Sequence, residues 1–182
     1  MPKFERCPKA VEKMGEALLK EFYPELVEAE ITVDYLFAYA DLDDFGNPKN
    51  DAITVGGYPA DGMARIVNLK DRAKGNRDAE IVLDGVEWDK LSEPEQRALL
   101  DHELYHFTLG KGTDDLSRPK LRMRKPDVHV GWFGLIAERH GIHSAERRQA
   151  KQIMEVKGQI YWPELVNAAT EHGRFQKIET KG

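Results

Sequence analysis

The spacing of hydrophobic residues along the chain changes from a helical period to a period of two, which distinguishes predicted helices from predicted strands. Apolar residues recur at helical spacing in 8–22, and Pro24 follows as a stop, which predicts an amphipathic first helix. From Glu30 to Tyr39 the period becomes two, and this alternation predicts a strand with at least one covered face. The shorter runs 63–69 and 80–84 predict two further strands. We therefore expect an α+β domain with a small sheet.

The segment from Ser92 to Phe107, SEPEQRALLDHELYHF, predicts a helix that begins with a capping box. Ser92 can cap the first turn, and Glu95, three residues later, can complete the box. Pro94 lies in the first turn, where its missing N–H is harmless. Three strands between the first helix and this one suggest a small sheet that packs on this helix and covers the metal site.

A helical wheel divides this helix into two arcs. One arc joins apolar side chains to the three residues of chemical interest: Leu99, Leu100, Phe107, His102, Glu103 and His106. The other arc carries Arg97, Ala98, Asp101 and Tyr105. We expect the first arc to face the core and the second to turn away from it. A carboxylate among apolar neighbours needs a partner, and a divalent cation supplies one.

The residues His102-Glu103-Leu104-Tyr105-His106 have the spacing HExxH. Two imidazoles at i and i+4 stand one above the other and can reach one zinc ion. Glu103 lies beside them and can accept a proton from a water on the open coordination position, as in zinc peptidases. The alternative is a chance pair of helix histidines. The capped helix and the apolar arc favour zinc binding.

Catalytic zinc normally takes three protein ligands, so a third is expected downstream. The candidates are Asp127, His129, Glu138, His140 and His143. We favour His129, because it follows the turn at Pro126 and because imidazole suits zinc. Glu138 is the next choice, since third ligands are often on helices, and Asp127 would accept a hydrogen bond from a ligand imidazole. His140 or His143 could instead stabilise an oxyanion.

A basic run lies between the helix and these candidates, in a segment where glycines and prolines exclude a long helix. It alternates with Leu121 and Met123 and consists of Arg118, Lys120, Arg122, Arg124 and Lys125. The alternation predicts a short strand or an extended arm. A solvated rim that offsets the acidic surface is the interpretation we favour; contact with nucleic acid or an acidic substrate is the alternative.

Three more helices are expected near the C-terminus. They span 131–140, where Gly141 ends the helix, 144–156, with Ser144 as cap, and 162–172. We divide the chain into a metallopeptidase domain, 1–143, and a helical extension of the same domain, 144–182.

Composition narrows the class of protein further. The 182 residues carry a net charge of −5, which argues against whole-surface binding to nucleic acid or anionic membranes. Cys7 is the only cysteine, so metal ligands within the chain must be His, Asp or Glu. We see no apolar stretch long enough for a signal peptide or a membrane span, and we expect a cytoplasmic protein without a membrane partner.

The run from Asp78 to Phe107 resembles the core signature of the phage metallopeptidase family: a short strand, a tryptophan-containing turn and a helix ending in HExxH. In that family a loop, an acidic or histidine-containing segment and an apolar helix closing at glycine follow. The matching positions are Ile81 to Leu83, Trp88, His102, Glu103, His106, Asp127, His129, Phe133 and Gly141. The resemblance covers roughly Ala29 to Gly141. PDVHVGWF is less acidic than the family's usual form of this segment.

This resemblance implies a zincin-like fold with Zn²⁺ held by His102 and His106 and with Glu103 as general base. It also implies a phage or prophage origin, hence the host cytoplasm, but no particular substrate. Our first hypothesis is a zinc-dependent metallopeptidase acting on a peptide or protein. The alternative is a zinc-stabilised binding protein that contacts nucleic acid or a protein through 118–125. Hydrolysis of a non-peptide amide would use the same residues.

Overall fold

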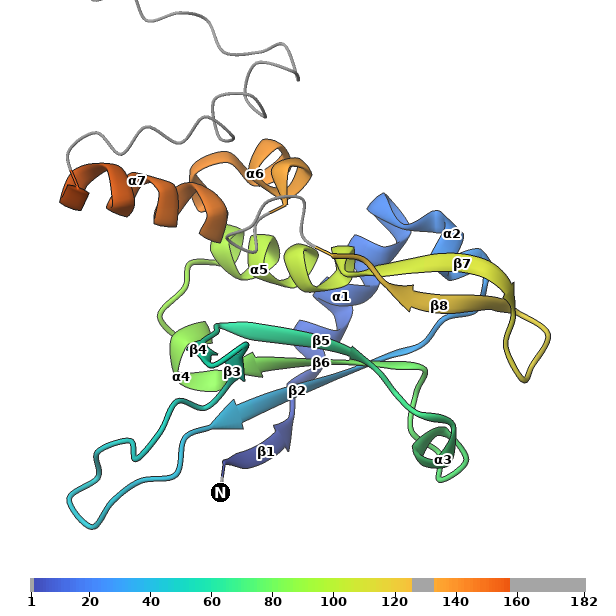
Figure 1. Cartoon of the computed structure of the whole chain (residues 1–182), viewed down its shortest axis with the longest axis horizontal. Helices are drawn as coiled ribbons and strands as arrows, with labels where there is room; N and C mark the ends of the chain where they lie inside the picture. The colour runs from blue at the N-terminus through green and yellow to red at the C-terminus, as the bar shows by residue number, and fades with distance from the viewer. Residues whose placement is uncertain (1, 126–132, 158–182) are drawn as a thin grey trace, which may run out of the picture. The chain divides into compact units, whose positions relative to one another are not determined.

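The computed structural model of the chain describes residues 2–125 and 133–157, with side chains up to Lys151 (Figure 1). These residues belong to two compact units, one ending at Lys125 and the other beginning at Pro126. The predicted mixture of helices and small sheets is confirmed. The division into 1–143 and 144–182 stays a prediction.

A four-stranded sheet forms the centre of the first unit. In spatial order its strands are β1 (Lys3–Arg6), β2 (Val33–Tyr39), β6 (Ala79–Asp84) and β5 (Gly62–Ile66). The central strands β2 and β6 are parallel, whereas β1 and β5 are antiparallel edge strands. The three predicted strands are therefore confirmed. Strand β1 was not predicted, because all four of its residues are exposed and carry no alternating pattern.

The first helix, α1 (Lys9–Phe22), packs against this sheet as the apolar spacing predicts. Gly15 makes the approach close, since a Cβ on it would collide with the phenol of Tyr35 in β2. Pro24 does more than stop α1. It occupies the first turn of a second helix, α2 (Pro24–Glu28), where a missing N–H costs nothing.

Short elements occupy the connections between the strands. They are the hairpin β3 (Thr54–Val55) and β4 (Tyr58–Pro59), α3 (Leu69–Arg72), and α4 (Gly85–Trp88). The predicted strand 63–69 is too long at its C-terminal end. It stops at Ile66 because the side chain of Asn68 accepts a hydrogen bond from the N–H of Asp71 at 3.0 Å and caps α3.

Helix α5 (Glu93–Tyr105) is the predicted HExxH helix, and its capping box is confirmed. The N–H and the hydroxyl of Ser92 donate to Glu95 Oε2 at 2.9 and 2.7 Å. The prediction that one arc turns away from the core is wrong. Ala98 and Asp101 are 1% and 0% exposed, because α5 contacts α1, β5 and β7 and is covered on several sides.

The segment after α5 is a β-hairpin, β7 (Phe107–Thr113) and β8 (Pro119–Met123), and not the loop expected for its first half. Leu109 and Leu121 pair across the hairpin and pack against the core. The strand predicted for the basic run is confirmed as β8. Arg118 is not a solvated rim residue, because its half-buried side chain belongs to an ion-pair network described below.

The second unit contains α6 (Gly134–His140), the 3-10 turn η1 (Gly141–His143) and α7 (Ala145–Lys157). Two predicted boundaries are confirmed. Gly141 ends α6 with a positive φ of 53°, and the Ser144 hydroxyl accepts a hydrogen bond from the N–H of Arg147 at 3.2 Å. The helix predicted at 162–172 lies outside the described residues. No helix in the described part of the chain is long and apolar enough to cross a membrane.

Candidate metal centre

The two histidines of the HExxH sequence lie together at the end of α5. His102 is in the last turn, and His106 is the residue that ends the helix. Their ring centroids are 5.3 Å apart and the ring planes cross at 73°. Two imidazoles that bind one tetrahedral zinc ion through nitrogens at about 2.1 Å have centroids about 5 Å apart. The pair therefore has the separation that a shared ion requires. Both rings are half-buried, and solvent can reach them.

The orientation of the His106 ring is fixed from outside its own helix. Its Nδ1 lies 3.1 Å from the main-chain carbonyl oxygen of Arg124, just beyond β8. A carbonyl oxygen can only accept, so Nδ1 carries the proton and donates it. In the neutral ring the lone pair is then on Nε2. Metal-binding histidines commonly use one nitrogen this way and leave the other for the ion.

Glu103 is the buried member of the motif, with 4% of its surface exposed. Its carboxylate packs on Gly62, the first residue of edge strand β5. A Cβ placed on Gly62 would lie 2.7 Å from Glu103 Oε1 and 3.0 Å from its Cδ, so any larger residue would displace the carboxylate. The two imidazoles therefore fit two ligand positions of a zinc ion, and Glu103 follows His102 directly in the chain as a buried carboxylate.

A second buried carboxylate holds α5 in place. Asp101 is fully buried, and the hydroxyl of Tyr23 donates to its carboxylate and, at 3.1 Å, to its main-chain oxygen. Tyr105 lies on the same side, with its ring centroid 6.4 Å from that of Tyr23. The guanidinium of Arg124 is 3.9 Å from the centre of the Tyr105 ring. These contacts fix the rotation of the helix that carries both histidines.

Two of the five candidates for a third ligand lie outside the described residues. Within the described residues, no group of three or more His, Cys, Asp or Glu side chains is placed to hold a metal. His129 and Asp127 fall outside these residues. Glu138 is exposed on α6, and His140 and His143 are half-buried at the end of α6 and in η1. The roles predicted for these five residues stay predictions.

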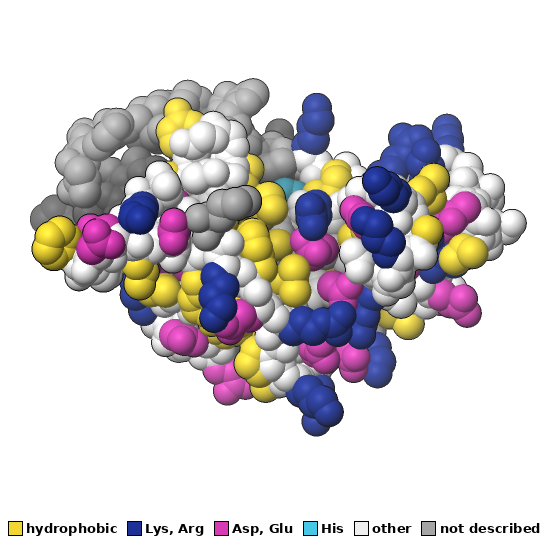
Figure 2. All heavy atoms as spheres, turned by 90° about the horizontal axis from the view of Figure 1, so that it is seen from below, with side chains coloured by type: hydrophobic (Ala, Val, Ile, Leu, Met, Phe, Trp, Pro, Cys, Tyr) yellow, Lys and Arg dark blue, Asp and Glu magenta, His cyan; other side chains and the backbone are white. Residues whose placement is uncertain are grey.

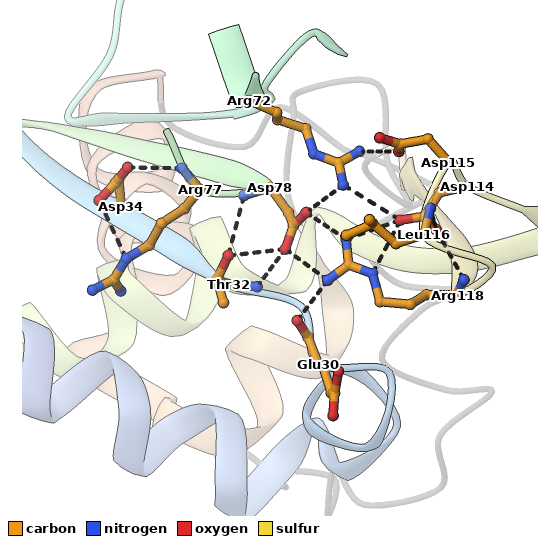
Figure 3. A network of polar contacts seen from close by, with 10 residues as sticks. All are labelled: Glu30, Thr32, Asp34, Arg72, Arg77, Asp78, Asp114, Asp115, Leu116 and Arg118. Atoms are coloured by element: carbon orange, nitrogen blue, oxygen red, sulfur yellow. Dashed lines mark hydrogen bonds and ion pairs between the residues drawn. The ribbon is translucent and has the colours of Figure 1, made fainter. Parts of the chain in front are cut away.

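An ion-pair network anchors the β7–β8 hairpin at the end remote from His106 (Figure 3). Arg118 donates to Asp78 at 2.6 Å, to Asp114 at 2.9 Å and to the carbonyl oxygen of Glu30 at 2.9 Å. Arg72 reaches the same Asp78 at 2.9 Å. The network joins the hairpin to the start of β6, to α3 and to the end of α2. The hairpin that orients His106 is thus clamped to the sheet.

The carboxylates of this network are held in the ionised form. Burial opposes ionisation of Asp78, but hydrogen bonds from Arg118 and Thr32 outweigh it and lower its pKa. Burial likewise opposes ionisation of Asp114, yet bonds from the N–H groups and guanidinium of the hairpin turn lower its pKa to about 2. The same contacts raise the pKa of Arg118. The network therefore remains fully charged at neutral pH.

Sequence reasoning missed the groups that support the motif from other elements. The only signal for one of them was Gly62, because a glycine that opens a strand can mark close packing. The carbonyl of Arg124 carries no side-chain signal at all. Asp101 was set aside because the helical wheel turned it away, whereas Tyr23 of another segment holds it in the core.

Comparison with known proteins agrees with the geometry. A family model described as Putative phage metallopeptidase matches residues 2–168, a longer span than the motif-based resemblance. No curated protein and no solved structure gives a significant match. A match over nearly the whole chain, on top of the paired imidazoles and the buried glutamate, is decisive: the chain belongs to the putative phage metallopeptidase family.

Proposed function

We propose that the chain is a zinc-dependent metallopeptidase with a zincin-like site, in which His102 and His106 hold the ion. The observation that carries the proposal is the buried carboxylate of Glu103, packed on Gly62 of an edge strand and adjacent in the motif to the imidazole pair. Membership of the family agrees with peptide hydrolysis. His129 is the third ligand in this proposal, with Glu138 or Asp127 as alternatives.

Bound zinc would lower the pKa of a coordinated water toward neutrality and polarise the scissile carbonyl. Glu103 is the general base that takes the proton from this water and then gives it to the departing amine. In our proposal, close packing on Gly62 keeps the Glu103 carboxylate in one position while it takes the proton from water and gives it to the amine. Donation of the Nδ1 proton to the Arg124 carbonyl puts the lone pair of the neutral His106 ring on Nε2, the nitrogen that would bind the ion.

The sheet offers a place for the substrate. Strand β5 has a strand partner on one side only, and its first residue touches the general base. An extended peptide can add to such an edge through its own backbone hydrogen bonds. In our proposal the substrate therefore lies along β5, with its scissile bond near Gly62.

The variant Glu103→Gln tests the catalytic role. We expect it to keep one zinc ion per chain and the native unfolding midpoint, and to lose cleavage of a denatured protein panel by about 10²–10⁴-fold. Glu93→Gln, an exposed change in the first turn of the same helix, is the matched control and should cleave normally. Native-level cleavage by Glu103→Gln would show that catalysis runs elsewhere.

The third ligand is tested separately by zinc affinity. His129→Ala should weaken zinc binding by orders of magnitude, whereas Glu138→Ala and Asp127→Ala should weaken it about tenfold or less. A large loss confined to Glu138→Ala or Asp127→Ala would transfer the ligand role to that residue. Competition with a chromogenic chelator measures the affinity without any need for activity.

A further inference from the structure

The β7–β8 hairpin has one face that continues from His106. Phe107 pairs with Met123, Thr108 with Arg122 and Leu109 with Leu121. One step before the first pair, the N–H of Arg124 donates to the carbonyl of His106. Because side chains alternate along a strand, Lys120 and Arg122 share one face of β8, and Arg124 continues it toward His106, whose ring contacts the Arg124 carbonyl. The other face, with Leu109 and Leu121, packs on the core.

This face is basic, and we call its residues Lys120, Arg122 and Arg124 the basic face. Segment 107–125 has six basic and two acidic side chains, a net charge of +4 in a chain of −5. Figure 2 shows Lys and Arg side chains crowding the side where Figure 1 draws α3, β7 and β8. Lys120 and Arg122 are exposed, and Arg122 lies across Gly110, where a Cβ would collide with it.

The cations of the basic face differ from Arg118, at the turn of the same hairpin, which two carboxylates neutralise. Among the described residues, no ion pair involves Lys120, Arg122 or Arg124, and the contact of Arg124 is with an aromatic ring. The two carboxylates of the hairpin, Asp114 and Asp115, are taken by Arg118 and Arg72 at the turn. The positive charge of the basic face is therefore open to a ligand.

From this arrangement we infer that the basic face selects peptide substrates with acidic side chains on the stretch that passes the hairpin. The inference rests on the proposed function and deepens it by naming the substrate class. Strand β8 lies beside β5, so a peptide along β5 runs next to the basic face. Alternate residues of an extended peptide are about 6.8 Å apart, the same spacing as Lys120, Arg122 and Arg124 along β8. Acidic residues at alternate positions match them.

A binding experiment tests the inference independently of cleavage. The protein is the full chain with Glu103→Gln, loaded with zinc. Two fluorescent peptides are compared, one with Glu and the other with Gln at the same three alternate positions. At low ionic strength, about 50 mM, we expect the Glu peptide to bind about tenfold more tightly. Lys120→Gln with Arg122→Gln should remove most of this preference. Lys13→Gln with Lys20→Gln, exposed cations of α1, should keep it.

Equal binding of the two peptides, or a preference that survives Lys120→Gln with Arg122→Gln, would overturn the inference. A single-stranded oligonucleotide serves as competitor. The inference is wrong if the oligonucleotide displaces the labelled Glu peptide at a lower concentration than unlabelled Glu peptide does, and if the double variant Lys120→Gln with Arg122→Gln abolishes this difference. In that case the basic face binds nucleic acid.

The native chain separates the two proposals. Cleavage of both peptides with the same kcat/KM would support the peptidase and overturn the acidic preference. Charge-dependent binding without cleavage would support the basic face and count against the peptidase.

Discussion

The imidazole of His106 donates from Nδ1 to the main-chain oxygen of Arg124 across 3.1 Å, so the hairpin sets the orientation of a residue that ends the helix. We expect the neutral, metal-free protein to hold His106 in the Nδ1–H tautomer. Long-range ¹⁵N–¹H correlation spectra at pH above 8 distinguish the two tautomers. His143, which lies in η1 of the second unit, provides an internal comparison. An Nε2–H tautomer for His106 would contradict the arrangement.

Gly62→Ala tests the seat of the general base. The new Cβ would lie 2.7 Å from Glu103 Oε1, so the carboxylate must shift away from its position. We expect kcat to fall at least about tenfold while zinc affinity stays within about twofold, because displacement of a general base costs rate more than binding. Gly134→Ala is the control, since a Cβ there meets no atom of the described residues within 4 Å. Equal kcat values for the two variants would show that Gly62 does not position the general base.

Tyr23→Phe tests the anchor of α5. The change removes the hydroxyl that donates to the buried carboxylate of Asp101, and the carboxylate loses a partner that water cannot replace. We expect the free energy of unfolding to fall by about 1–3 kcal/mol. Urea unfolding measures it. Tyr58→Phe makes the same chemical change at a tyrosine that is 76% exposed, and it should alter stability by less than about 0.5 kcal/mol.

Arg118→Met tests the clamp on the hairpin. Loss of the guanidinium leaves Asp78 buried, although Arg72 still reaches it at 2.9 Å. We therefore expect a loss of about 2 kcal/mol, less than the 3–5 kcal/mol typical of a buried charge left alone. Lys74→Met, which breaks an exposed ion pair with Asp71, should cost at most about 0.5 kcal/mol. Similar costs for the two variants would mean that the clamp contributes little.

The same network predicts a dependence of stability on pH. The pKa values of Asp78 and Asp114 are lowered in the folded protein, that of Asp114 to about 2, whereas a free aspartate titrates near 3.9. Below about pH 4 the unfolded chain binds protons that the folded chain does not, so this stabilisation is full above pH 4 and fades toward pH 2. In EDTA, unfolding free energies at pH 5 and 3 should differ more for the native chain than for Arg118→Met.

The local sequence pattern was sufficient to predict the helix and the strands that carry the site. The start of α5, its Ser92–Glu95 box and the HExxH spacing depend on residues within about four positions of one another, and all could be predicted. The end of the helix was predicted two residues too late, because Phe107 is the first residue of β7. The alternation in β2 could be predicted because a covered strand face repeats every second residue. The sequence by itself therefore determined which side chains are brought together at the end of α5.

Only the tertiary structure decided what surrounds those side chains. The contact of Tyr23 with Asp101 spans 78 residues and that of Arg118 with Asp78 spans 40. The seat of Glu103 on Gly62 is likewise formed by separate elements. Such pairings depend on how helices and strands pack, and a single sequence carries no periodic signal of this. The helical wheel failed at Asp101 for the same reason: it assumes one covered side, whereas α5 is covered by neighbours on several sides.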